Sequence, residues 1–244
     1  MGFMDAHVHL GTRYTSDLGV STILEEMDKQ GIEKVFCMAI DSAPEDCNEK
    51  VMEAISGHED RLIPFCWVNP WDAKALDKLK YGIEQMGMKG LKIHPVQDGF
   101  PADRAYLLDP LFEVIDHYGL HAIVHCTSDA PYSSPLQLEK TAKRWPNVTI
   151  QMAHMGGCWL SNEAIRVALR NDNIYLDSAT VSLSAVTRAA KALPDRLLMA
   201  TDVPFYAFEM EKLKMKLVAQ DDTELFEKIS YKNMARLIAE RGLV

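Results

Sequence analysis

The chain has 244 residues, of which 48% are hydrophobic and 25% are charged, and its formal net charge is −9. This composition is typical of a globular protein, and the length suits one large α/β domain or two small ones. The net negative charge repels phosphate backbones and anionic lipids at long range, so we expect neither nucleic acid nor a membrane surface as a partner.

The five cysteines have no C-x-x-C spacing, which favours a reducing compartment. The first residues lack a basic region followed by an apolar stretch, and no apolar run approaches the ~18 residues of a membrane span. We therefore expect a cytoplasmic protein.

Short apolar runs recur along the chain and predict eight β-strands. They span residues 3–10, 34–40, 62–69, 90–94, 121–126, 148–154, 174–179 and 196–203. Segments with helical apolar spacing lie between them, such as the stripe formed by Leu76, Leu79 and Ile83. Asp109-Pro110 and Ser134-Pro135 each predict a helix start, with a capping residue followed by proline at the first helical position.

Strands that alternate with helices pair in parallel through right-handed crossovers. The polar residues that end successive runs recur at intervals of about 23 to 32 residues, which is one strand and one helix per step. Eight such units, with a total length close to the ~250 residues typical of the fold, predict a single (β/α)8 TIM-type barrel domain over residues 1–244. An open doubly wound sheet is the alternative.

Histidine and aspartate end several of the predicted strands. Side chains alternate along a strand, so His7 and His9 point to the same side of the first one. His125, His154 and Asp202 end the fifth, sixth and eighth strands. In a barrel these ends meet at the catalytic face. Two neutral imidazoles and a carboxylate suit a borderline cation such as Zn²⁺, with Fe, Mn, Co and Ni as alternatives.

A single histidine at a strand end is more often a hydrogen-bonded structural residue than a ligand. Five such histidines (His7, His9, His94, His125 and His154) together with Asp202 favour a functional site. We expect Asp5 to make a hydrogen bond deeper in the barrel. Asp177 either supports a neighbouring histidine or caps the next helix.

Six short motifs occur in a characteristic order along nearly the whole chain. They are Asp5-Ala6-His7-Val8-His9, Gly90-Leu91-Lys92-Ile93-His94-Pro95, Val124-His125, Ala153-His154-Met155-Gly156-Gly157, Thr201-Asp202-Val203-Pro204 and Asn233-Met234-Ala235-Arg236-Leu237. Together they resemble the amidohydrolase superfamily, and specifically its amidohydrolase-related branch of metal-dependent hydrolases, which includes decarboxylases of the aminocarboxymuconate-semialdehyde type.

The resemblance implies a role for each residue of the predicted site. His7, His9, His125 and Asp202 would hold one tightly bound metal, and His154 would contact the metal-bound water. Asp202 could accept the proton of that water and pass it to the leaving group, while His154 orients the water or stabilises the developing charge. Asp202 and His154 are therefore the predicted catalytic residues.

The fourth strand offers a candidate site for a second metal or for substrate, because Lys92 and His94 share a face there. Binuclear relatives use a carboxylated lysine or a glutamate there to bridge two metals, and Lys92 matches that place. His94 could equally bind substrate. Arg13 and Trp159 follow strands and are candidate substrate contacts.

These residues predict metal-dependent hydrolysis of a small molecule with an amide, ester or lactone bond, through a metal-activated water. The alternative is non-oxidative decarboxylation of a small carboxylic acid at the same site, with Arg13 and Arg104 as carboxylate partners. A barrel that binds a ligand without catalysis is a third hypothesis. The resemblance also implies that the chain could form a homodimer.

Overall fold

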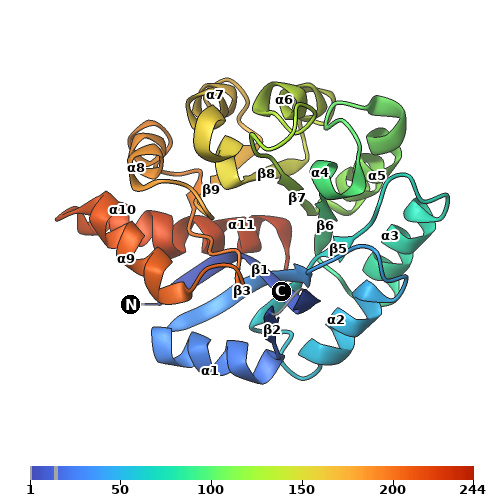
Figure 1. Ribbon diagram of the computed structural model, residues 1–244, viewed down its shortest axis with the longest axis horizontal. Helices are drawn as coiled ribbons and strands as arrows, with labels where there is room; N and C mark the ends of the chain where they lie inside the picture. Colours follow the sequence, from blue (N-terminus) through green and yellow to red (C-terminus); the bar gives the residue numbers. More distant parts are fainter. Residues whose placement is uncertain (1, 14–15) are drawn as a thin grey trace.

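A closed ring of parallel strands forms the centre of the molecule, and helices surround it (Figure 1). The computed structural model describes residues 2–13 and 16–244, without the side chains of residues 12–13 and 16–18. The strands are β1 (Phe3–Arg13), β2 (Ser16–Leu18), β3 (Ile32–Ala39), β4 (Leu62–Pro64), β5 (Cys66–Trp67), β6 (Gly90–Ile93), β7 (His121–His125), β8 (Thr149–Ala153), β9 (Ile174–Asp177) and β10 (Leu197–Leu198).

Two sheets join to close this ring. One runs in the order β2-β1-β3-β4, with β2 antiparallel to the end of β1, and the other runs β10-β9-β8-β7-β6-β5. Ala6 N donates to Met199 O (2.9 Å) and Asp202 N donates to His7 O (2.8 Å), which connects β1 to the segment after β10. β4 and β5 are parts of one strand interrupted at Phe65. The fold is therefore the α/β TIM-type barrel that the sequence predicts.

The helices pack on the outside of the ring. They are α1 (Val20–Gln30), α2 (Cys47–Ile55), α3 (Ala75–Glu84), α4 (Pro95–Asp98), α5 (Ala105–Tyr118), α6 (Pro135–Arg144), α7 (Gly157–Leu169), α8 (Leu183–Ala192), α9 (Phe208–Ala219), α10 (Thr223–Glu227) and α11 (Asn233–Arg241). A 3₁₀ turn, η1 (His154–Gly156), precedes α7, and a π-helical turn, η2 (Lys228–Lys232), precedes α11. Within the described residues, no helix is long and apolar enough to cross a membrane.

The two predicted proline helix starts have different outcomes. Ser134 caps α6 and forms a capping box with Gln137, as predicted. Helix α5 instead begins at Ala105 and contains Pro110, so the predicted start at Asp109 is wrong. The reason is that Leu108, one residue before that predicted start, is completely buried, and packing of this side chain extends the helix upstream.

Strands β7, β8 and β9 are buried along their whole length, as expected for parallel strands with both faces covered. At the start of β6, a Cβ atom on Gly90 would lie 2.3 Å from His121 O. Only glycine allows β6 and β7 to approach this closely. The tight ring brings the carboxyl ends of the strands together at one mouth.

Candidate metal centre

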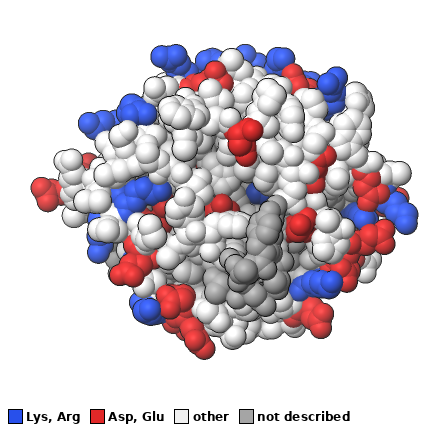
Figure 2. Space-filling model, in the orientation of Figure 1, with Lys and Arg blue, Asp and Glu red and all other residues white. Residues whose placement is uncertain are grey.

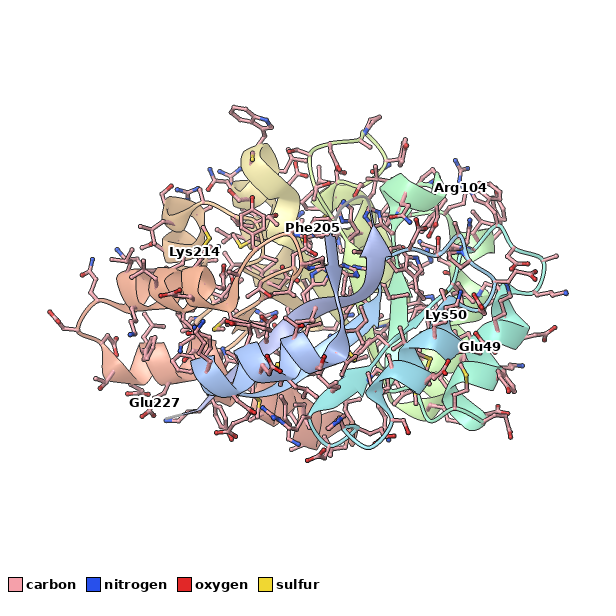
Figure 3. All side chains as sticks on the ribbon, turned by 60° about the horizontal axis from the view of Figure 1, so that its bottom comes forward. Glu49, Lys50, Arg104, Phe205, Lys214 and Glu227 are labelled. Carbon is pink, nitrogen blue, oxygen red and sulfur yellow. The ribbon has the colours of Figure 1, made fainter. Side chains whose placement is uncertain are left out.

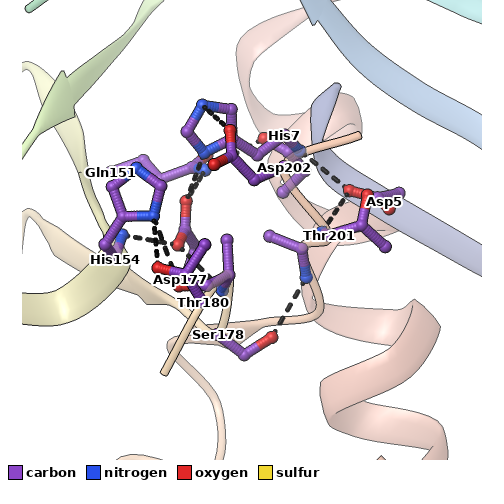
Figure 4. A network of polar contacts seen from close by, with 12 residues as sticks. Asp5, His7, Gln151, His154, Asp177, Ser178, Thr180, Thr201 and Asp202 are labelled. Carbon is purple, nitrogen blue, oxygen red and sulfur yellow. Dashed lines mark hydrogen bonds and ion pairs between the residues drawn. The ribbon is translucent and has the colours of Figure 1, made fainter. Parts of the chain in front are cut away.

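Polar side chains from several strand ends converge at the mouth of the barrel. His7 and His9 come from β1, Asp177 ends β9, His154 directly follows β8, and Asp202 lies four residues after β10. Figure 4 shows His7, His154, Asp177 and Asp202 close together. His7 and Asp177 are completely buried, and Asp202 is only 9% exposed. The surrounding face carries acidic and basic side chains mainly around its periphery (Figure 2). The predicted convergence of distant residues is thus present in the structure.

Six rings follow one another around the mouth, and we call them the ring circle. They are Trp67, His94, His125, His154, His7 and His9, and the last lies next to the first. Neighbouring ring centroids are 3.6 to 5.9 Å apart, the closest pair being His94 and His125, which stack. Because these side chains contact one another, each restricts the rotamers of its neighbours. The ring circle is therefore a preorganised set of five imidazoles, with the Trp67 indole between His9 and His94.

Two of the converging side chains are attached to backbone of unusual conformation. His154 has φ 63° and Asp202 has φ 68°, in the left-handed region that residues with a side chain seldom adopt. Both conformations are held by hydrogen bonds, from His154 N to Asp177 Oδ1 (2.7 Å) and from Asp202 N to His7 O (2.8 Å). Backbone strain of this kind costs about 1–3 kcal/mol per residue and is concentrated at functional sites.

The tautomers of His7 and His9 follow from their partners. His7 Nδ1 lies 3.1 Å from Asp177 Oδ2, and His9 Nδ1 lies 2.7 Å from Ala39 O, so both Nδ1 atoms donate. Each Nε2 of the neutral rings then carries a lone pair, yet the two Nε2 atoms are only 3.2 Å apart. Asp202 Oδ1 lies 3.3 Å from His9 Nε2 and 3.7 Å from His7 Nε2. Three electron-pair donors that face one another can bind a cation between them.

Protonation states agree with a metal site. Burial lowers the pKa of His7 and His9, so both rings are neutral and can act as ligands. Burial alone would raise the pKa of Asp202, but the close contact with His9 and the nearby His154 and Lys92 outweigh it, and the pKa is lowered. His7, His154 and Asp202 each offer one donor atom, all within 4.8 Å of one another. The residues therefore fit a divalent metal.

The two residues of the predicted second position have different surroundings. Lys92 on β6 is completely buried, and its Nζ lies 3.0 Å from His7 Nε2 and 5.6 Å from the centre of the Trp67 ring. Burial lowers its pKa to about 8. His94 caps α4, where its Nδ1 accepts from Gln97 N (3.1 Å). The Lys92 amine thus lies beside the candidate metal position, and His94 is turned toward its own helix.

His125 lies in the ring circle, but its Nε2 is turned to the following loop. This atom is 3.0 Å from Thr127 Oγ1 and 3.6 Å from Asp129 Oδ2. Burial is the main reason that its pKa is lowered to about 3. As a metal ligand, His125 stays a prediction, because in this conformation Nε2 already has other partners.

The predicted substrate contacts lie outside the ring circle. Trp159 on α7 is 83% exposed. Arg104 precedes α5 and its guanidinium lies over the Tyr106 ring (5.8 Å). Arg13 ends β1, and its side chain lies outside the part of the chain that the structure describes.

Asp177, which the sequence leaves open between two roles, supports the site. Its carboxylate accepts from His7 Nδ1 (3.1 Å) and Gln151 Nε2 (2.8 Å) on one oxygen. The other oxygen accepts from His154 N (2.7 Å) and Ala179 N (3.2 Å). Sequence reasoning missed Gln151. The signal for it is an amide side chain in the middle of a fully buried strand, β8.

Two more buried carboxyl groups, those of Asp5 and Glu211, lie near this network. Asp5 Oδ1 accepts from His7 N (3.0 Å) and Thr201 N (3.1 Å), as expected for a residue deeper in the barrel. Burial raises its pKa to about 8. Glu211 on α9 accepts from Ser178 and lies 2.8 Å from Lys214 Nζ, and burial raises its pKa to about 7 despite these partners.

Glu211 leads to a test of stability against pH. A pKa that rises from 4.5 in the unfolded chain to about 7 in the fold means that protonation stabilises the fold. This contribution, about 3 kcal/mol, is present below pH ~4.5 and is lost as pH rises through ~7. We expect Glu211→Gln to gain stability relative to the parent between pH 5 and pH 8, measured by urea unfolding. The exposed Glu113→Gln is the control, and a pH-independent difference for Glu211→Gln would contradict the prediction.

A (β/α)8 barrel with imidazoles and a carboxylate converging at its mouth defines the class of metal-dependent TIM-barrel enzymes. A family model described as Amidohydrolase matches residues 5–238, and the chain belongs to this family. No curated protein matches the chain in sequence.

Several solved structures share this fold. An uncharacterized TIM-barrel protein from Bordetella bronchiseptica is 19% identical, with a TM-score of 0.81 over 99% of this chain and 100% of the other. A 2,6-dihydroxybenzoate decarboxylase from Rhizobium is 16% identical, with a TM-score of 0.78 over 98% of both chains. A dihydroxybenzoic acid decarboxylase from Polaromonas, with bound manganese and the inhibitor 2-nitroresorcinol, is 15% identical, with a TM-score of 0.78 over 98% of this chain and 97% of the other. At these identities, the similarity establishes the fold.

Proposed function

We propose that the chain is a metal-dependent, non-oxidative decarboxylase of a small carboxylic acid, with hydroxylated benzoic acids as the first candidates. The observation that carries this proposal is the full-length similarity to the two dihydroxybenzoate decarboxylases, combined with the donor cluster that His7, His154 and Asp202 form at the barrel mouth of this chain. Hydrolysis is the main function expected from the sequence, and these relatives favour the alternative over it.

The walls of the site support decarboxylation of a planar acid. The ring circle includes the Trp67 indole, which is only 2% exposed and has its Nε1 fixed by Asp98 Oδ2 (3.1 Å). Phe205, labelled in Figure 3, packs edge-on against His9 with the ring centroids 6.4 Å apart. A carboxylate that enters between such rings loses much of its water, and the loss of solvation favours release of neutral CO₂.

His7, His9 and Asp202 would hold the ion, with His125 as the predicted fourth ligand. When bound, a divalent ion would supply positive charge that lowers the energy of the negative charge developing as the carbon–carbon bond breaks. The manganese in the Polaromonas enzyme makes Mn²⁺ a candidate beside the Zn²⁺ expected from the donor types. A second ion at Lys92 and His94 stays a prediction.

Lys92 and His154 act on the substrate in this proposal. Once His7 Nε2 is a ligand, Lys92 loses that hydrogen-bond acceptor, and we assign its ammonium to the substrate carboxylate. As CO₂ leaves, the bonding electron pair stays on the substrate carbon, which must take up a proton. We assign delivery of this proton to His154, whose Nδ1 lies 3.3 Å from Ala179 O.

An experiment in D₂O distinguishes the two reactions. Protein loaded with Zn²⁺ or Mn²⁺ is incubated with 2,6-dihydroxybenzoate, and separately with amide, ester and lactone substrates. Decarboxylation releases CO₂ and places one deuterium on the carbon that carried the carboxylate, which NMR detects, whereas hydrolysis does neither. His7→Ala serves as the control and should be inactive.

Hydrolysis through an activated water is the second candidate, because Asp202 and His154 lie on the same donor cluster and could handle the protons of a water. Turnover of an amide, ester or lactone without CO₂ release would reject decarboxylation and support this second function.

A further inference from the structure

His121 is a buried polar side chain at the end of the barrel opposite the mouth. It begins β7, whereas His125 in the ring circle ends the same strand. The His121 ring is completely buried beside Phe36 and Phe65, with ring centroids 5.8 and 5.7 Å away. Burial in this apolar floor lowers the pKa of His121 to about 4, although a hydrogen bond with a neighbouring side chain opposes the shift. The ring is therefore neutral and carries a single N–H group.

A series of hydrogen bonds connects His121 to His7 at the mouth. His121 Nε2 lies 3.2 Å from Gln151 Oε1, and Gln151 Nε2 lies 2.8 Å from Asp177 Oδ2. The same Asp177 oxygen lies 3.1 Å from His7 Nδ1. We call these four side chains the polar column, and the last three of them are labelled in Figure 4. All four are completely buried and come from four different strands, β7, β8, β9 and β1.

The direction of each hydrogen bond in the polar column is determined by its members. Gln151 Nε2 uses its two hydrogens on Ala6 O (2.9 Å) and Asp177 Oδ2 (2.8 Å). The reverse orientation of the amide would place its oxygen against these two acceptors, so the amide has one satisfied orientation. In that orientation Gln151 Oε1 needs a donor, and the Nε2–H of His121 is the donor in contact with it.

We propose that His121 is a positioning residue for the metal centre, although it lies at the far end of the barrel. Its Nε2–H fixes the Gln151 amide, the amide fixes the Asp177 carboxylate, and the carboxylate orients the ring of His7. His121 thus acts through two other side chains and contacts neither metal nor substrate. This inference rests on His7 as a metal ligand, which belongs to the proposed function, but it does not depend on which reaction the site catalyses.

Metal titration of variants at position 121 tests the proposal. His121→Phe keeps a ring between the two phenylalanines but leaves Gln151 Oε1 buried without its donor. We expect the dissociation constants for Zn²⁺ and Co²⁺ to rise about 3- to 10-fold, less than the ~10- to 100-fold expected when a direct partner of a ligand is lost. The visible absorption bands of the Co²⁺ protein should shift as well, because the His7 ring is reoriented.

Two further variants at this position separate the hydrogen bond from the shape of the side chain. His121→Met also lacks a donor but fills the space with a flexible chain, and it should show the same loss of affinity. His121→Gln supplies an amide N–H and should restore the parental affinity and spectrum. Phe65→Leu is the matched control, because it alters the packing around His121 and leaves the polar column intact. It should lower the melting temperature but keep the parental dissociation constants and spectrum.

A double-mutant cycle shows whether His121 acts through Gln151. In a Gln151→Leu background, His121→Phe should cause no further loss of metal affinity. A parent protein that binds neither ion would reject the metal centre and this role of His121 together. A parent that binds metal, with His121→Phe equal to it in affinity and spectrum, would reject only the role of His121. An undiminished effect of His121→Phe in the Gln151→Leu background would also overturn the proposal.

Discussion

The Asp202→Asn protein is expected to bind metal poorly and to lose ~10³-fold or more in kcat/KM. Asp202 is the carboxylate at the donor cluster, with Oδ1 3.3 Å from His9 Nε2 and 3.7 Å from His7 Nε2. An amide removes the negative charge that offsets the charge of the ion and contributes a weaker donor. Metal content per chain, isothermal titration with Zn²⁺ and Mn²⁺, and steady-state kinetics measure the effect.

A matched control for Asp202→Asn is Asp172→Asn, at a carboxylate that is fully exposed to solvent. This variant should keep the metal stoichiometry and the activity of the parent. An Asp202→Asn protein with parental metal affinity would show that Asp202 is not a ligand. Loss of activity with full retention of metal would restrict its role to proton handling.

The second large effect is expected for Asp177→Asn. The Asp177 carboxylate accepts two hydrogen bonds on each oxygen, from His7 and Gln151 on one side and from His154 and Ala179 on the other. An asparagine amide can accept on only one side, and its NH₂ group would face two donors on the other. Either the His7 ring or the His154 backbone is therefore released. We expect the affinity for metal to fall by about 10- to 100-fold.

The affinity effect must be separated from a general loss of stability. Titration of the metal-free protein gives the dissociation constant, and thermal unfolding without metal gives the stability. Leu79→Ala, which removes a completely buried side chain on α3, lowers stability without touching the site and should bind metal like the parent. Equal affinities for Asp177→Asn and Leu79→Ala would contradict the prediction.

Strand periodicity was sufficient to predict which distant residues meet. His7 and Asp202 are far apart in the sequence, but His7 lies on β1 and Asp202 in the segment after β10, and these two segments are neighbours in the closed ring. The alternation of side chains also placed His7 and His9 on the same side. These properties depend on backbone geometry, which the apolar pattern largely determines.

The direction of individual atoms could not be predicted in the same way. His125 ends its strand as expected, but the choice between the metal position and Thr127 for its Nε2 is a matter of rotamer and loop structure. The role of Asp177 was ambiguous because its side-chain partners, the Nδ1 of His7 and the amide of Gln151, come from other strands and no local sequence pattern predicts them. The Asp109-Pro110 signal failed because tertiary packing of α5 overrode a local cap.

The left-handed backbone at His154 and Asp202 has a consequence for protein engineering. Glycine, and to a lesser extent asparagine, adopts this conformation with less strain than histidine or aspartate. A screen of the metal-free protein for heat resistance alone would therefore enrich replacements at the two positions that the proposed chemistry needs most. Selection for thermostability in this barrel has to be coupled to metal retention or turnover, or it will produce robust but inert proteins.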